Sequence, residues 1–245
     1  MSILSKTKVL AFYSFILFPV SEKVNAISEG NPIESIGEQT IILPRVYKPL
    51  EFKSSFSILF TKLPMDWVET SVEVPILQFD ARLGLPAGFT IDGNVESIWV
   101  SNRLSLGPHW NIAMGKFSFG AGFDASFMYG KMTVSGFDNE AWGWGTTPNF
   151  SVGFKTKDIA FTIKGELKKI SSLKITSGST EISNEKNFRS GWAIGFYVEQ
   201  PLWKDHVMVM GLINNFQKFY YAAWPAFSAF NRQYYIPQIY IGLVL

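Results

Sequence analysis

The sequence predicts an all-β protein, an antiparallel transmembrane β-barrel of about ten strands. Three observations indicate this fold. The chain ends on a strand-like run, 234–245, in which every second residue from Tyr235 to Leu245 is apolar. It begins with a segment typical of protein export. Between the two, apolar and polar residues alternate with period two, and no stretch after residue 26 reaches 18 consecutive apolar residues, as a membrane-spanning helix would.

Residues 1–26 are expected to form a cleaved signal peptide. Lys6 and Lys8 precede an uncharged apolar run at 9–20, which is shorter than the roughly 20 residues of a spanning helix. Val24 and Ala26 then place small residues where a signal peptidase reads them. Prolines and glycines interrupt any regular element up to residue 50. We therefore expect a signal peptide at 1–26, an irregular segment at 27–50 and the barrel at 51–245.

Composition excludes several classes of protein. Without Lys6, Lys8, Lys23 and Glu22 of the signal peptide, the 22 basic and 20 acidic residues leave a net charge of zero. This balance argues against a basic surface for nucleic acid. The absence of cysteine excludes disulfides and a lipid-carrying cysteine anchor. Charged residues make up 17%, below the roughly 25% of soluble domains, and aromatic residues 16%.

Alternation defines the expected strands in order. The clearest run has apolar residues at every second position from Leu77 to Ile91, a spacing that a helix does not produce. A tight turn is expected next, at Asp92-Gly93-Asn94. Because 66–76 and 95–110 are ambiguous, eight or twelve strands remain alternatives. The ten expected segments are 52–61, 68–74, 77–91, 98–114, 117–129, 150–155, 159–168, 189–199, 207–220 and 234–245.

Connections of two lengths separate these strands. With ten strands, the short turns at 115–116, 157–158 and 203–206 all fall at one end of the barrel. Three expected long loops, at 133–146, 172–187 and 221–233, all fall at the other. This segregation is typical of outer-membrane barrels.

Together these features resemble the small bacterial outer-membrane β-barrel proteins as a class. The resemblance implies export to the outer membrane of a Gram-negative-type bacterium. It also implies two partners, outer-membrane lipid and the barrel assembly machinery, which would read the C-terminal strand. One departure is Leu245, because such proteins usually end in an aromatic residue. The segments 43–45 and 63–70 are faintly similar to barrels that take up aromatic compounds.

Charged residues predicted to face inward are the most function-like feature. Opposed charges produce a transverse field across a water-filled pore, whereas in a narrow barrel they pair and plug the lumen. Both alternatives stay open. The predicted lumen-lining residues are Asp80, Arg82, Arg103, Asp124, Lys155, Lys164, Glu166, Arg189 and Glu199.

Three tryptophans mark the expected long loops. Trp142, Trp144 and Trp224 either capture a hydrophobic solute or a surface partner, or belong to the aromatic girdle at the membrane interface. An uptake channel for small hydrophobic or aromatic solutes is therefore an alternative function. It predicts that residues 219–230 fold inward over the mouth of the barrel.

Catalytic and metal-binding features are sparse. The chain has two histidines, His109 and His206, and no Gly-x-Ser-x-Gly motif. Its potential ligands do not cluster as metal ligands do, and no cofactor is expected. We therefore predict a non-enzymatic barrel, a small porin-like channel or a structural membrane protein. The third alternative, an outer-membrane hydrolase of protease or lipid A deacylase type, requires His109 at the outer rim beside a Ser or an Asp.

Overall fold

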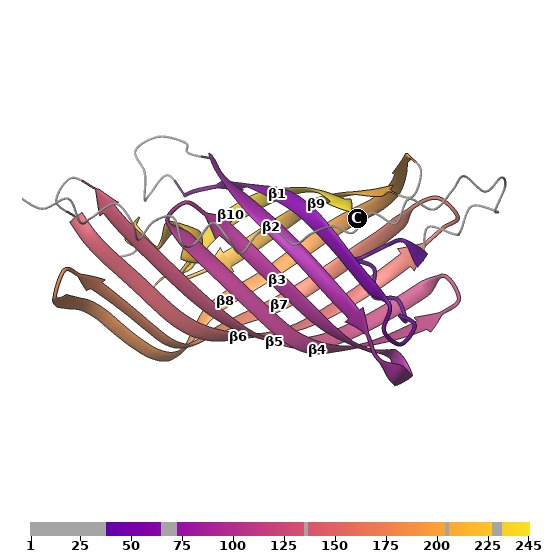
Figure 1. The fold of residues 1–245 in the computed structure, drawn as a ribbon, viewed down its shortest axis with the longest axis horizontal. Helices are drawn as coiled ribbons and strands as arrows, with labels where there is room; N and C mark the ends of the chain where they lie inside the picture. Colours follow the sequence, from indigo (N-terminus) through magenta and orange to yellow (C-terminus); the bar gives the residue numbers. More distant parts are fainter. Residues whose placement is uncertain (1–37, 65–72, 135–136, 204–205, 227–231) are drawn as a thin grey trace, which may run out of the picture. The chain divides into compact units, whose positions relative to one another are not determined.

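Ten antiparallel strands close into one barrel (Figure 1). The computed structural model describes residues 38–64, 73–134, 137–203, 206–226 and 232–245. Each strand pairs with its sequence neighbours, and the last pairs with the first, so the predicted fold class is confirmed. The strands are β1 (Phe52–Lys62), β2 (Glu73–Gly84), β3 (Phe89–Ile98), β4 (Ser101–Met114), β5 (Phe117–Val134), β6 (Phe137–Lys155), β7 (Ala160–Ser177), β8 (Thr180–Trp203), β9 (His206–Gln217) and β10 (Tyr234–Val244).

The closing strand β10 follows the alternation seen in the sequence. Ile239 and Ile241 are exposed on the outer face, whereas Ile236 and Tyr240 are buried on the inner face. Its pairing with β1 runs from Ser55–Val244 to Thr61–Gln238. Period-two patterning therefore sets which side chains enter the lumen, because successive residues of a strand point to opposite faces.

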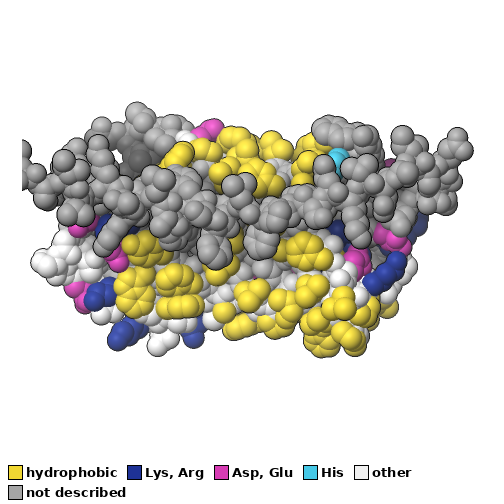
Figure 2. Space-filling view, viewed as in Figure 1, with side chains coloured by type: hydrophobic (Ala, Val, Ile, Leu, Met, Phe, Trp, Pro, Cys, Tyr) yellow, Lys and Arg dark blue, Asp and Glu magenta, His cyan; other side chains and the backbone are white. Residues whose placement is uncertain are grey.

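The outer wall carries a broad apolar surface. In Figure 2, hydrophobic side chains gather across the middle of the visible face and charged ones lie mostly toward its two ends. Such a surface is stable only against lipid, so the barrel is a transmembrane one. The exposed residues include Phe56, Phe79, Leu104, Leu106, Phe123, Phe150, Ile163, Phe196, Leu212, Ile239 and Ile241.

No helix among the described residues is long and apolar enough to cross a membrane.

The boundary between β2 and β3 differs from the expectation. The chain turns at 85–88, where Ala87 and Gly88 have positive φ values of 61° and 80°, and the 3-10 turn η3 (Pro86–Gly88) forms. The expected turn at Asp92-Gly93-Asn94 is therefore wrong, because these residues lie within β3. The alternation runs unbroken through the real turn, so period alone could not locate it. The expected break at Pro75 is also wrong, because β2 continues through Pro75, which pairs with Phe60. Residues 73–74 of the expected strand 68–74 therefore belong to β2, and 68–72 lie outside the described residues.

Two of the three expected long loops are also corrected. The expected loop at 133–146 is mostly strand, because residues 137–146 belong to β6. The expected loop at 172–187 is also mostly strand, because 172–177 belong to β7 and 180–187 belong to β8. Long hairpins therefore replace both loops. The remaining connection, between β9 and β10, contains the 3-10 segment η4 (Tyr221–Ala226). We call this end of the barrel the hairpin end, and the end with turns at 85–88, 115–116 and 156–159 the turn end.

Register shifts occur where the long hairpins leave the barrel. On the β7–β8 ladder, Lys168 pairs with Gly191 but Lys169 pairs with Arg189, which leaves Ser190 as an extra residue on β8. A bulge of this kind reverses the inward and outward phase of the strand beyond it. The β6–β7 ladder shifts between Trp144 and Gly145 at a similar level.

The chain before β1 contributes a lumenal segment. Residues 40–47 have no regular secondary structure, and most of their side chains are buried. The predicted signal peptide at 1–26, and 27–37 of the irregular segment, lie outside the described residues.

Candidate functional site

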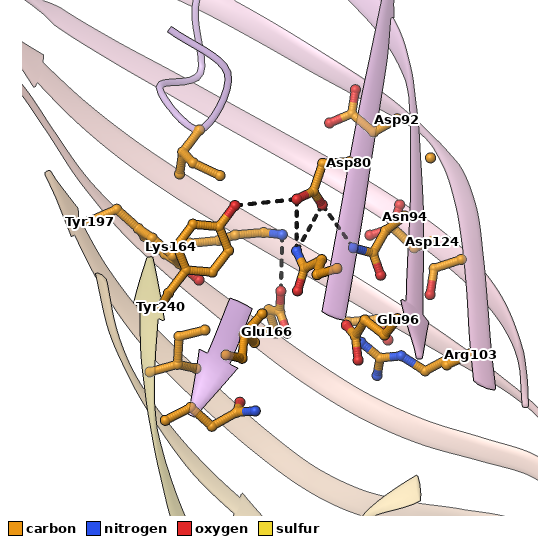
Figure 3. A pocket seen from close by; sticks show the side chains of 18 of the residues that line it. Asp80, Asp92, Asn94, Glu96, Arg103, Asp124, Lys164, Glu166, Tyr197 and Tyr240 are labelled. Atoms are coloured by element: carbon orange, nitrogen blue, oxygen red, sulfur yellow. Dashed lines mark hydrogen bonds and ion pairs between the residues drawn. The ribbon is translucent and has the colours of Figure 1, made fainter. Parts of the chain in front are cut away.

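A polar chamber of about 140 Å³ lies in the middle of the lumen (Figure 3). Alternation directs polar side chains from most of the strands into it. Segments of the lumen that are not part of the barrel wall also border it, through Ile41, Ile42, Tyr220 and Tyr221. Its volume has room for several water molecules. The ionisable residues that line it are Asp80, Arg82, Asp92, Glu96, Arg103, His109, Asp124, Lys164, Glu166 and Lys168, with Tyr197, Tyr220, Tyr221 and Tyr240.

The cations of the chamber pair with carboxylates of a neighbouring strand or of their own strand. Arg82 of β2 pairs with Asp92 of β3, and Arg103 of β4 pairs with Glu96 of β3. On β7, the Glu166 carboxylate lies 2.9 Å from Lys164 Nζ and 3.7 Å from Lys168 Nζ. Pairing compensates for moving these charges out of bulk water, which would otherwise be strongly unfavourable.

Asp80 differs from these carboxylates because its hydrogen-bond donors are neutral. The Gln78 amide donates at 2.9 and 2.8 Å, the Asn94 amide at 2.8 Å, and the Tyr240 hydroxyl at 3.3 Å (Figure 3). Ser55 donates at 3.4 Å. The chamber therefore combines paired charges with a carboxylate that neutral dipoles stabilise.

His109 lies on β4 in the half of the barrel nearer the turn end. Its Nε2 is 2.8 Å from Asp124 Oδ1, and its Nδ1 is 3.5 Å from Asp92 Oδ2. Only 7% of the residue is exposed, and its ring lies directly over Gly122. The hydrolase hypothesis expects His109 beside an Asp at the outer rim of the barrel. Asp124 does lie beside His109, but His109 lines the central chamber and does not lie at a rim.

The first of two closures, which we call the turn-end closure, is formed by residues 40–47. The backbone N–H groups of Ile41, Ile42 and Leu43 donate to the Glu199 carboxylate at 2.7, 3.0 and 2.8 Å. Glu199 of β8 is fully buried. Successive N–H groups around one anion form a nest, in which several dipoles share a single charge. One side chain of the wall thus anchors three backbone donors of the segment.

Glycines of the wall make room for this segment. A Cβ on Gly153 would lie 2.4 Å from Leu43 Cδ1, and one on Gly120 would lie 2.7 Å from Pro44 Cβ. These close approaches explain why β5 and β6 carry glycine on their inner faces here.

The end of the segment is tied to the start of β1. Arg45 pairs with Glu51, and the Lys48 N–H donates to the same carboxylate at 2.9 Å. Partial burial alone would raise the pKa of Glu51, but the hydrogen bonds and the charges of Arg45 and Lys53 hold it below its ordinary value. Burial raises the pKa of Tyr47, whose hydroxyl donates to the Thr40 carbonyl at 3.0 Å.

The second closure, at the hairpin end, is formed by residues 219–224 after β9. The Tyr220 hydroxyl accepts a hydrogen bond from Gln238 Nε2 at 2.7 Å and lies 3.3 Å from Thr61 Oγ1. Burial, with the nearby charge of Glu96, raises the pKa of Tyr220 above its ordinary value. Ser190 Oγ donates to the Phe219 carbonyl at 3.2 Å.

Aromatic packing completes this hairpin-end closure. Trp224 is 1% exposed, and a Cβ on Gly130 would lie 2.3 Å from its Nε1. The Arg103 guanidinium lies 5.0 Å from the centre of the Tyr221 ring, a cation–π contact at the boundary of the chamber. Ser101 Oγ donates to the Tyr221 carbonyl at 3.0 Å.

Most of the predicted lumen residues lie on the inner face. Glu199 is beneath the turn-end closure rather than in the chamber. Lys155 has an inward position at the turn end, opposite the buried Ala160, but does not border the chamber. The residues that do border it are Asp80, Arg82, Arg103, Asp124, Lys164 and Glu166.

Arg189 is a correction. It is exposed and pairs with the exposed Lys169, so it lies on the outer face of the wall. The extra residue Ser190 reverses the strand phase that places Gly191 and Ala193 inside. A bulge has no signature in the period-two pattern, and for that reason the sequence misplaced this residue.

The three tryptophans divide between two surroundings. Trp142 and Trp144 lie on strand β6 and point outward, 37% and 53% exposed, so their assignment to a loop is wrong. Trp144 contacts Phe127 with ring centres 4.5 Å apart. Trp224 does lie in a loop, but it is buried in the hairpin-end closure.

Several chamber residues escaped the sequence prediction. Asp92 and Glu96 were missed because the turn was expected at 92–94, and once β3 is placed at 89–98 both face inward. Lys168 is in phase with Lys164 and Glu166, so the same alternation could have found it. Tyr197 and Tyr240 follow the inward phase of β8 and β10. The prediction omitted them because it considered only charged residues as lumen-lining.

The part of the chain that the structure describes contains no group of three or more His, Cys, Asp or Glu side chains suited to a metal ion.

No protein-family model and no curated protein matches this chain. Solved structures do match, at low identity. A KdgM porin is 12% identical (78% of this chain, 97% of that one, TM-score 0.38). Outer membrane phospholipase A from Escherichia coli is 8% identical (86% and 98%, TM-score 0.42). The CymD monoaromatic hydrocarbon channel is 10% identical (89% and 76%, TM-score 0.39).

The class-level resemblance to outer-membrane barrels is confirmed, and that to aromatic-compound channels also recurs among these structures. These three TM-scores are below 0.5, so the likeness carries no information about the function of this chain.

Proposed function

We propose that this protein is a non-enzymatic outer-membrane channel for small polar solutes, closed at both mouths in the state described here. The observation that carries the proposal is the charged chamber enclosed between two segments that are not part of the wall. A purely structural barrel needs only a filled lumen, whereas this lumen keeps a polar space between two separate closures.

The chemistry of the chamber supports a polar rather than an apolar solute. Ion pairs such as Arg103–Glu96 and Lys164–Glu166 border it, and opposed charges of this kind select among polar solutes by their charge. The buried residues 219–224 agree with the hydrophobic-uptake hypothesis in part, because it expects 219–230 to fold inward and 227–230 lie outside the described residues. The charged lining opposes it, because an apolar solute would have to desolvate the ion pairs without replacing their hydrogen bonds.

Single-channel conductance in a planar bilayer tests the proposal. The chain from residue 27 onward is refolded as wild type and as the double variant Glu199→Gln/Trp224→Ala, which weakens both closures. We expect the wild type to be almost silent and the double variant to show discrete current steps that grow with salt concentration. Gln200→Ala, on the outer face of the same strand as Glu199, is the matched control and should behave as wild type.

Correct insertion has to be shown independently, by heat-modifiable migration in gels. A double variant that inserts correctly and stays silent would contradict the channel proposal and favour a structural barrel with a permanently plugged lumen.

A further inference from the structure

The bulge at Ser190 brings two cations together on the outside of the barrel. Lys169 of β7 and Arg189 of β8 are directly opposed in the ladder, and both are exposed. Without the extra residue, Arg189 would share the inward phase of Gly191. The bulge therefore moves a guanidinium from the lumen to the outer wall, as bulges commonly re-aim a side chain.

A third cation, Lys218, follows directly after β9. The Lys218 N–H donates to the Ser190 carbonyl at 2.7 Å, which places Lys218 beside the bulge. Its neighbours Gln217 and Phe219 are buried, whereas Lys218 is half-buried. We call Lys169, Arg189 and Lys218 the outer cation row.

The outer cation row differs from other cations at the same end of the barrel in its lack of a carboxylate partner. Lys174 lies 3.0 Å from Glu181, and Lys131 lies 3.7 Å from Glu140. Within the described ranges, no carboxylate lies in ion-pair distance of any member of the outer cation row. Like charges directly opposed across strands destabilise a sheet. An anion from outside the chain would reduce the repulsion between Lys169 and Arg189.

The position of the row identifies the source of that anion. The next outward pair toward the middle of the wall is Leu167–Trp192. Trp192 stacks on Phe216 with ring centres 4.3 Å apart, and Phe216 contacts Tyr235 at 5.1 Å. Such aromatic ladders lie where the hydrocarbon core of a membrane meets its headgroups. The cation row therefore begins one residue pair beyond the lipid-facing surface.

We propose that the outer cation row binds the phosphate-bearing headgroup of a membrane lipid. Guanidinium and ammonium groups are the side chains that recognise phosphate, and the aromatic ladder packs against the acyl chains below. The exposed apolar wall gives this lipid a fixed orientation, with its phosphate at the hairpin end.

Lipid retention measured by native mass spectrometry tests the proposal. The protein is refolded in phosphatidylcholine vesicles containing phosphatidic acid, extracted in mild detergent and compared with the double variant Lys169→Gln/Arg189→Gln. We expect wild type to retain phosphatidic acid and the variant to bind it about 25-fold more weakly, at roughly a fivefold loss for each cation near an anionic surface. Lys157→Gln, which removes one charge at an exposed turn-end lysine, should keep wild-type retention.

Two results would overturn the inference. One is equal retention of phosphatidic acid by wild type and the double variant. The other is loss of retention in Lys157→Gln as large as in the double variant, which would show a diffuse charge effect. A separate arm adds inorganic phosphate to the extracted protein. If it displaces the lipid at millimolar concentration, the row is a free-anion site and not a lipid site.

Discussion

The two closures of the barrel differ in how they are held. At the turn end, residues 41–43 place three backbone N–H groups on the Glu199 carboxylate, and Arg45 secures the segment through Glu51. At the hairpin end, aromatic side chains of residues 219–224 are buried, and their polar contacts include hydrogen bonds with Thr61, Ser101, Ser190 and Gln238.

Because of this difference, the two closures should be weakened by different changes. A nest around one carboxylate depends on a single residue and on its charge, so it should respond sharply to one substitution and to a smaller extent to acid. Aromatic burial is spread over many contacts and is insensitive to acid, so it should respond in proportion to the surface removed.

The largest effect is expected from Trp224→Ala. Removing a fully buried tryptophan should lower the free energy of unfolding by about 3–5 kcal/mol, because the cavity cannot collapse against a closed wall. Urea unfolding in lipid vesicles measures the change. Amide exchange at residues 41–43 should stay as in wild type, and a parallel rise there would show that the two closures are coupled.

Glu199→Gln should loosen the turn-end closure by about 1–3 kcal/mol. The amide keeps the shape of the side chain but puts an NH₂ group where the carboxylate accepted backbone donors. Hydrogen exchange of the amides of Ile41, Ile42 and Leu43 should become about 5- to 150-fold faster. Gln200→Ala serves as the control on the same strand. Unchanged amide exchange at residues 41–43 in Glu199→Gln would contradict the inference that this carboxylate anchors residues 40–47.

Paired glycine substitutions sharpen the comparison at a smaller scale. Gly130→Ala would put a methyl group against the rigid Trp224 ring, and Gly153→Ala would put one against the flexible end of Leu43. We expect Gly130→Ala to destabilise by about 1–3 kcal/mol and Gly153→Ala by less, because a leucine can change rotamer. Thermal unfolding of both variants in one detergent decides the order, and the reverse order would contradict it.

The smallest expected effect is that of pH. The pKa of Glu51 is lowered in the folded protein, so its contribution is present above the ordinary value of 4.5 and is lost as pH falls through the lowered value. Residues 219–224 contain no carboxylate. Acid should therefore speed amide exchange, corrected for its intrinsic pH dependence, at 41–43 but not at 220–224. Glu51→Gln should reduce the acid effect, and an undiminished effect would assign it to another group.

Alkali should not separate the closures. The pKa values of Tyr47 and Tyr220 are both raised by burial, so the stability that each contributes is present below the ordinary tyrosine value and is lost as pH rises through the raised one. Each closure contains one of these residues, and both should loosen together above about pH 10.

Particular residues show how far the sequence could predict the site. Asp80, Arg82, Lys164 and Glu166 were placed correctly because they lie in uninterrupted alternation on single strands. Arg189 was misplaced by one extra residue, and Asp92 by a turn that lies inside an alternating run. Bulges and turns are decided by pairing with the neighbouring strand, so they leave little trace in a single strand's pattern.

The sequence by itself determined the fold class and the apolar outer face, because alternation is a local property of an extended chain against lipid. Only the tertiary structure decided what fills the lumen. Residues 40–47 and 219–224 carry no periodic pattern, and their places depend on partners such as Glu199 and Gly130, which are distant in sequence. Ring closure brings these partners together, and no local pattern encodes a contact that exists only after the barrel has closed.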